Sequence, residues 1–118
     1  MEVVVVIDCQ DRIALATFWC DVLGYERAPD GPVYTSLLPP DGRGPEVLLQ
    51  EVDEVKVTKN RLHLDLRVAD VHAEVARLEG LGARRLHDEA IIENGWTWWV
   101  LADPEDNEFC CLEPPPHG

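Results

Sequence analysis

The residues best suited to chemistry lie in an alternating stretch near the middle of the chain, residues 61–68. Its polar members, each separated from the next by one apolar residue, are Arg61, His63, Asp65 and Arg67. Side chains of a strand alternate between its two faces, so these groups share one face. A face that holds an imidazole, a carboxylate and two guanidinium groups indicates a wet or ligand-filled concavity rather than a dry core.

His63 and Asp65 are the candidate catalytic residues. An imidazole beside a carboxylate can act as a general base, which suffices for proton abstraction. On a regular strand, side chains two residues apart stand roughly 6.5–7 Å from each other, so Asp65 need not contact the ring. The alternative is that His63 only packs or donates hydrogen bonds, while its polar neighbours pair with one another on an open surface.

Three of the four tryptophans lie within residues 96–99. On a strand, Trp96 and Trp98 share a face and Trp99 points away. Two indoles beside His63 would suit a flat or aromatic ligand, to which stacking adds on the order of 1 kcal/mol beyond burial. We therefore predict that Trp96 and Trp98 line the same cavity as His63. The alternative is that the indoles seal a core or a subunit interface.

The charge balance limits the partners. The chain has 23 acidic and 10 basic residues and a net charge of −13, which repels nucleic acids and anionic membrane surfaces. Arg61 and Arg67 could therefore receive an acid group of a ligand or neutralise acidic neighbours. No apolar run approaches the roughly 20 residues of a membrane span, and we expect a cytoplasmic protein. The four cysteines lack a CxxC pair, so we expect free thiols.

The elements that must position these residues occur twice. Asp11 begins a helix-like stretch that ends at Gly24, and Asp70 begins another, 59 residues later, that ends at Gly82. Asp is a favoured N-cap and Gly a favoured C-terminal residue. The expected strands around the two helices span residues 3–7, 33–38 and 46–52, then 62–68, 96–101 and 108–112. The repeat predicts two modules with a pseudo-twofold relation.

We expect a single domain over residues 1–113, with module one at about residues 1–55 and module two at about 60–113. A length of 118 residues suits one compact domain. Residues 114–118, which include His117, are expected to form a flexible tail. His72, on the second helix, and His87, in a polar loop, are expected to be solvated.

Several motifs resemble the glyoxalase-like domain of the vicinal oxygen chelate superfamily. They include Leu15-Ala16-Thr17-Phe18-Trp19, Leu23-Gly24-Tyr25-Glu26, Lys59-Asn60-Arg61-Leu62-His63-Leu64-Asp65 and Asp103-Pro104-Glu105-Asp106-Asn107-Glu108-Phe109-Cys110. The resemblance implies an α+β fold of two βαβββ modules that form a curved open barrel, commonly as a homodimer. That superfamily contains lyases, dioxygenases, epimerases, isomerases and antibiotic-binding resistance proteins, so the resemblance does not name a reaction.

The resemblance also implies where a divalent metal would bind. Carried over by position, the ligands would be Val4, Gln50, His63 and Cys110. Val4 has no lone pair to donate, and a neutral amide such as that of Gln50 is a weak ligand. We therefore expect no metal cofactor, although Gln50, His63 and Cys110 would be the ligands if one were bound.

The sequence as a whole predicts a small-molecule binding protein or a metal-independent enzyme. Its ligand, an aromatic or anionic small molecule, is expected to contact Gln50, Arg61, Arg67, Trp96, Trp98 and Cys110, with His63 and Asp65 as the reactive pair. One alternative is a divalent-metal-dependent lyase or dioxygenase. Another is a non-catalytic resistance or sequestering protein.

Overall fold

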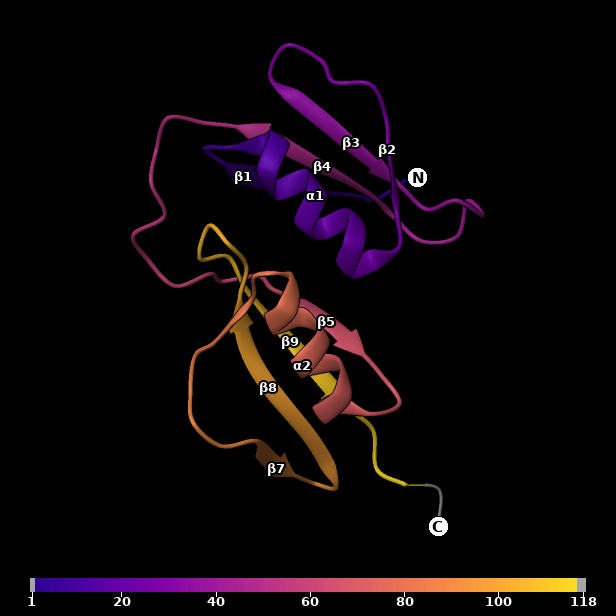
Figure 1. Ribbon diagram of the computed structural model, residues 1–118, viewed down its shortest axis with the longest axis vertical. Helices are drawn as coiled ribbons and strands as arrows, with labels where there is room; N and C mark the ends of the chain where they lie inside the picture. The colour runs from indigo at the N-terminus through magenta and orange to yellow at the C-terminus, as the bar shows by residue number, and fades with distance from the viewer. Residues whose placement is uncertain (1, 117–118) are drawn as a thin grey trace. The chain divides into compact units, whose positions relative to one another are not determined.

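The computed structural model describes residues 2–116. The chain divides into two compact units, with the boundary between Val55 and Lys56 (Figure 1). The predicted tail, residues 114–118, lies partly outside the described residues. His117 lies wholly outside them. Neither helix among the described residues has the length and apolar character that crossing a bilayer requires.

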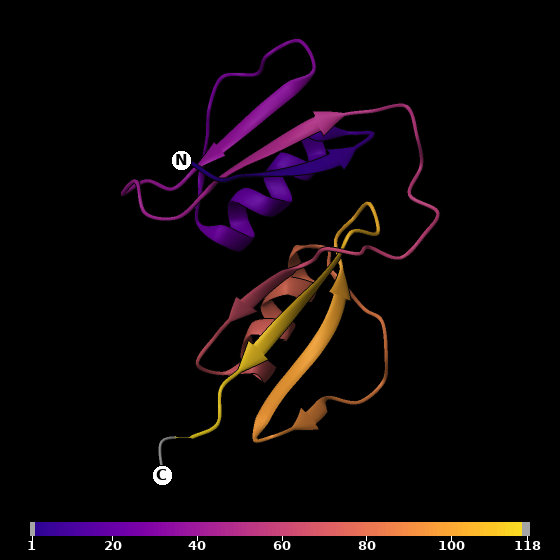
Figure 2. The same cartoon turned by 180° about the vertical axis from the view of Figure 1, so that it is seen from behind.

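The first unit has the expected βαβββ order. Its elements are β1 (Val4–Cys9), α1 (Arg12–Leu23), β2 (Glu26–Arg27), β3 (Tyr34–Leu38) and β4 (Glu46–Glu51). The strand order in the sheet is β1-β4-β3-β2, with β1 parallel to β4 and the other pairs antiparallel. Helix α1 lies on one face of this sheet, and Figure 2 shows the opposite face.

Both ends of α1 form as the sequence predicts. The Asp11 carboxylate accepts a hydrogen bond of 3.1 Å from the Ala14 amide, and Gly24 ends the helix with a φ of 69°, which glycine adopts without strain. Leu15, Phe18 and Trp19 are buried on the sheet side. Burial of such side chains contributes roughly 1.5–3 kcal/mol each, so packing on the sheet holds the helix in place.

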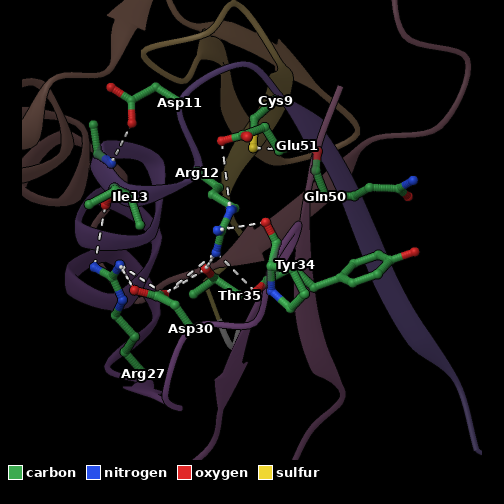
Figure 3. A network of polar contacts seen from close by, with 12 residues as sticks. Cys9, Asp11, Arg12, Ile13, Arg27, Asp30, Tyr34, Thr35, Gln50 and Glu51 are labelled. Carbon is green, nitrogen blue, oxygen red and sulfur yellow. Dashed lines mark hydrogen bonds and ion pairs between the residues drawn. The ribbon is translucent and has the colours of Figure 1, made fainter. Parts of the chain in front are cut away.

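A polar network fixes the loop between β2 and β3 (Figure 3). The half-exposed Asp30 carboxylate accepts hydrogen bonds from Thr35 Oγ1, at 2.8 Å, and from Arg27. These bonds, with that of Thr35 the largest cause, lower the pKa of Asp30. Arg12 donates to the carbonyl oxygens of Pro32 and Tyr34. The loop is therefore bound to the first turn of α1 through charged groups rather than through apolar contacts.

The second unit repeats this plan with one strand more than expected. Its elements are β5 (Leu64–Arg67), α2 (Val71–Leu81), β6 (Arg84–Arg85), β7 (Ile91–Glu93), β8 (Trp96–Ala102) and β9 (Glu108–Glu113). The sheet order is β5-β9-β8-β6, and the additional short strand β7 pairs with β8. The Asp70 carboxylate caps α2 by accepting from the Ala73 amide. The fold is thus α+β with two related units.

The strand predicted over residues 62–68 is shorter than expected. It begins at Leu64, which pairs with Phe109, the second residue of β9. An alternating strand over residues 62–68 would place Leu62 on the face that packs against the helix, but Leu62 is instead 89% exposed. The reason is a long-range contact: just before this segment, the Asn60 amide donates to the Glu108 carboxylate at 2.8 Å instead of joining a ladder. His63 consequently precedes the strand.

Candidate functional site

A cavity of about 470 Å³ opens on the sheet of the second unit. It is lined by alternate residues of the two long strands, which are Trp96, Trp98 and Val100 of β8 and Glu108, Cys110 and Leu112 of β9. Trp99 and Cys111, which point to the other face, are buried in the core with α2. The cavity therefore occupies the sheet face that the helix leaves open.

His63 and Asp65 meet at this cavity. The distance from His63 Nδ1 to Asp65 Oδ1 is 3.0 Å, and each side chain is about half exposed. Direct contact is possible because His63 lies outside the regular strand, where the spacing of alternate side chains does not apply. A carboxylate only accepts, so Nδ1 carries the proton. In the neutral ring Nε2 is then the nitrogen that can accept a proton from a ligand.

Cys110 lies directly across the β5–β9 ladder from Asp65. Burial, and next the negative charge of Asp65, raise the pKa of this thiol to about 11. At neutral pH the sulfur is therefore protonated. A protonated thiol is a poor nucleophile and must lose its proton before it can bind a metal.

Glu108 holds the segment that leads to His63. Besides the Asn60 amide, its carboxylate contacts Lys59 Nζ at 3.4 Å and Lys56 Nζ at 4.0 Å. The bond from the Asn60 amide is the main cause that lowers the pKa of Glu108. Two of the chain's few cations thus neutralise a carboxylate at the rim of the cavity.

The structure places the predicted tryptophan pair and His63 along one cavity. Arg61 and Arg67, in contrast, are not among the residues that line it within the described part of the chain. The Arg67 guanidinium instead lies 5.6 Å from the ring centre of Trp96. Their contact with an acid group of a ligand stays a prediction.

Gln50 and Cys110, the two last-strand ligands that the resemblance implies, do not occupy equivalent positions of the two units and differ by two residues in register. Gln50 pairs with Asp8 on β1, three residues before the helix cap Asp11, whereas the equivalent residue before Asp70, Arg67, pairs with Leu112. The counterpart of Gln50 is therefore Leu112. Gln50 belongs to the first unit, and its contact with a ligand or metal stays a prediction.

His87 is the residue that the sequence interpretation misjudged most. It is half-buried, its Nε2 accepts from the Val100 amide at 3.0 Å, and its ring stacks on Trp99 with centres 5.0 Å apart. The prediction that it is solvated is wrong, because among the described residues neither β6 nor β7 includes Val100 in its register with β8, and the imidazole accepts from the Val100 amide instead. Only a known register of β6 and β7 on β8 could have revealed this role.

Three possible metal ligands converge at the cavity. The ligand atoms of His63, Asp65 and Cys110 all lie within 4.8 Å of one another. One nitrogen, one oxygen and one sulfur donor fit zinc, which accepts all three and keeps a fourth position open in catalytic sites. They fit manganese poorly, because it prefers carboxylate, carbonyl and water ligands.

Comparison with known proteins identifies the family. The family model of the glyoxalase-like domain matches residues 4–112. The chain belongs to the glyoxalase-like domain family. This family and the similar solved structures place it in the vicinal oxygen chelate superfamily. No curated protein matches the sequence.

Several solved structures share the fold at low sequence identity. A glyoxalase-related enzyme from Fulvimarina pelagi is 21% identical with a TM-score of 0.71, over 100% of this chain and 94% of that one. A glyoxalase/bleomycin resistance protein/dioxygenase family enzyme from Burkholderia phytofirmans PsJN is 19% identical with a TM-score of 0.71, over 92% and 94%. The fosfomycin resistance protein FosX from Listeria monocytogenes, complexed with Mn(II) and sulfate, is 12% identical with a TM-score of 0.76, over 97% and 90%.

Proposed function

We propose that this glyoxalase-like protein binds a small aromatic molecule in the cavity of its second unit, without a metal cofactor. The observation that carries the proposal is that cavity: about 470 Å³, within the roughly 300–1,000 Å³ typical of ligand pockets. Two indoles lie along it together with one hydrogen-bonded imidazole–carboxylate pair. Apolar aromatic walls with a few polar groups are what such sites require.

The His63–Asp65 pair gives this site a chemical function. Asp65 holds Nδ1 and thereby fixes the ring, so Nε2 can accept a hydrogen bond or a proton from the ligand. Where the bound molecule carries a proton of suitable acidity, His63 acts as the base and Asp65 stabilises the imidazolium that forms. Where the bound molecule has no such proton, His63 only forms a hydrogen bond to it, and the protein sequesters its ligand.

Tryptophan fluorescence tests the binding site. We expect some members of a library of small aromatic acids, amines and neutral compounds to quench the emission, and Trp98→Ala to abolish the response. His63→Ala should weaken binding by about 1–2 kcal/mol, because one partly buried hydrogen bond is lost. His72→Ala is the matched control, since His72 is exposed on α2 and does not line the cavity. Ligands whose binding survives both cavity substitutions would refute the proposed site.

A zinc-dependent enzyme is the second candidate, and the convergence of His63, Asp65 and Cys110 favours it. Bound zinc would act as a Lewis acid or activate a water molecule. The raised pKa of Cys110 argues against tight binding, because the thiol must first release its proton. Calorimetric titration with zinc and with manganese should therefore show weak binding of both at pH 7. A tight one-to-one zinc site, lost in His63→Ala and in Cys110→Ser, would favour this second candidate.

A further inference from the structure

The charges around the cavity are mainly negative. Its lining includes the carboxylates of Asp65, Glu93 and Glu108, whereas Lys59 is its only lysine or arginine within the described residues. Lys59 forms an ion pair with Glu108, and so does Lys56. An anionic ligand would therefore meet a carboxylate that no lysine or arginine compensates, and the net charge of −13 adds to this repulsion.

Glu93 is the cavity carboxylate without a cationic partner among the described residues. Asp65 contacts His63, and Glu108 contacts the two lysines, but no cation among residues 2–116 forms an ion pair with Glu93. Glu93 lies on β7 directly opposite Trp96 in the β7–β8 ladder. A negative charge thus stands beside an indole at the cavity wall.

One of the two cavity indoles already accepts a cation in this structure. The Arg67 guanidinium lies 5.6 Å from the ring centre of Trp96, within the distance of about 6 Å at which a cation is attracted to an indole face. Trp98, the next cavity residue along β8, has no such partner among the described residues. Its ring remains available for a positive group of a ligand.

We propose that the ligand of this cavity carries a positive charge, an ammonium or guanidinium group, on an aromatic or apolar body. The inference rests on the proposed function and names the ligand class of the same site. Trp98 receives the cation, Glu93 compensates its charge, and Trp96 and Leu112 contact the apolar body. This ligand class differs from the anionic one that the sequence suggested, because Arg61 and Arg67 are not among the described residues that line the cavity.

Two probes of equal shape and different charge test this inference. They are (4-hydroxyphenyl)trimethylammonium and its neutral isostere 4-tert-butylphenol, with 4-hydroxybenzoate as the anion, each titrated calorimetrically into the full chain. We expect the cation to bind about tenfold more tightly than the isostere at low salt and the anion to bind least, because indole and carboxylate act together. The preference should shrink at 0.5 M NaCl.

Variants assign the preference to its residues. Glu93→Gln should reduce the affinity for the cation several-fold and leave that for 4-tert-butylphenol unchanged. Glu89→Gln removes the same charge from an exposed residue that does not line the cavity, and it should change neither. Equal binding of cation and isostere would overturn the charge inference while the binding site stands. Failure of all three probes, together with failure of the library screen, would overturn both.

Discussion

At the scale of single residues, Asp65 is the centre of the site. Its Oδ1 lies 3.0 Å from His63 Nδ1, and Asp65 is paired with Cys110 across the β5–β9 ladder. One negative charge thereby orients the imidazole and disfavours a thiolate. The pairing separates the roles, because the His63 ring is held for proton transfer while the Cys110 thiol keeps its proton at neutral pH.

Replacing Asp65 should make Cys110 more reactive. Its charge is the second cause, after burial, that raises the pKa of Cys110 to about 11. In Asp65→Asn this pKa should fall, so the thiolate fraction at pH 8 and the rate of alkylation by iodoacetamide should rise several-fold. Tandem mass spectrometry separates Cys110 from its neighbour Cys111, whose pKa is raised mainly by burial and next by Glu74. Cys111 should not change; an unaltered Cys110 rate would contradict the role given to Asp65.

The sequence predicted side chains on regular strands better than those beside them. Trp96 and Trp98 could be placed on one face because β8 is regular there. The contact of His63 with Asp65 could not, because it depends on the end of a strand, which Asn60 and Glu108 set through a contact 48 residues apart. Long-range hydrogen bonds of this kind leave no periodic signal in the sequence.

At the scale of elements, the turn between β8 and β9 sets the register on which the cavity depends. Asp103 is buried, and its carboxylate accepts from the amides of Glu105 and Asn107 at 2.8 and 2.9 Å and from the Asn107 side chain at 2.9 Å. A slip of one residue would turn Trp98 and Cys110 to the other face. The turn therefore positions the cavity residues of both strands.

Asp103→Ala should destabilise the fold by about 2–4 kcal/mol, because three partly buried donors lose their acceptor. Asp106→Gly in the same turn is the control. Asp106 has a φ of 68°, which glycine adopts freely, and its exposed ion pair with Arg84 contributes at most about 1 kcal/mol. Urea denaturation should separate the two variants clearly. Similar midpoints would show that the Asp103 bonds do not hold the turn.

At the scale of the whole molecule, each unit has one sheet face that its helix does not cover, and the two units differ in the side chains on that face. In the second unit this face carries the cavity. In the first unit it carries the exposed apolar side chains Val4, Val6, Tyr34 and Leu38. Both α+β units were predictable because capped helices and apolar strands leave local signals, whereas the short strand β7 left none.

We expect the protein to form a homodimer, because apolar side chains on an open sheet face favour association. Sedimentation at micromolar concentration should give twice the chain mass of 13.3 kDa. The net charge of −13 opposes association, so the dimer should strengthen between 50 and 500 mM NaCl. Val6→Glu should weaken it without altering the circular dichroism. A monomer at every concentration and salt level would contradict this expectation.

The register shared by the two units has a consequence for how this chain can change over time. The positions that hold His63, Asp65 and Cys110 in the second unit hold Val4, Val6 and Leu48 in the first, relative to the same capped helix and the same parallel strand pair. A duplicated frame offers each position twice. One copy can keep aliphatic side chains while the other acquires donors and acids, so new ligands can be accommodated by exchanging a few side chains on strands whose backbone bonds do not involve them.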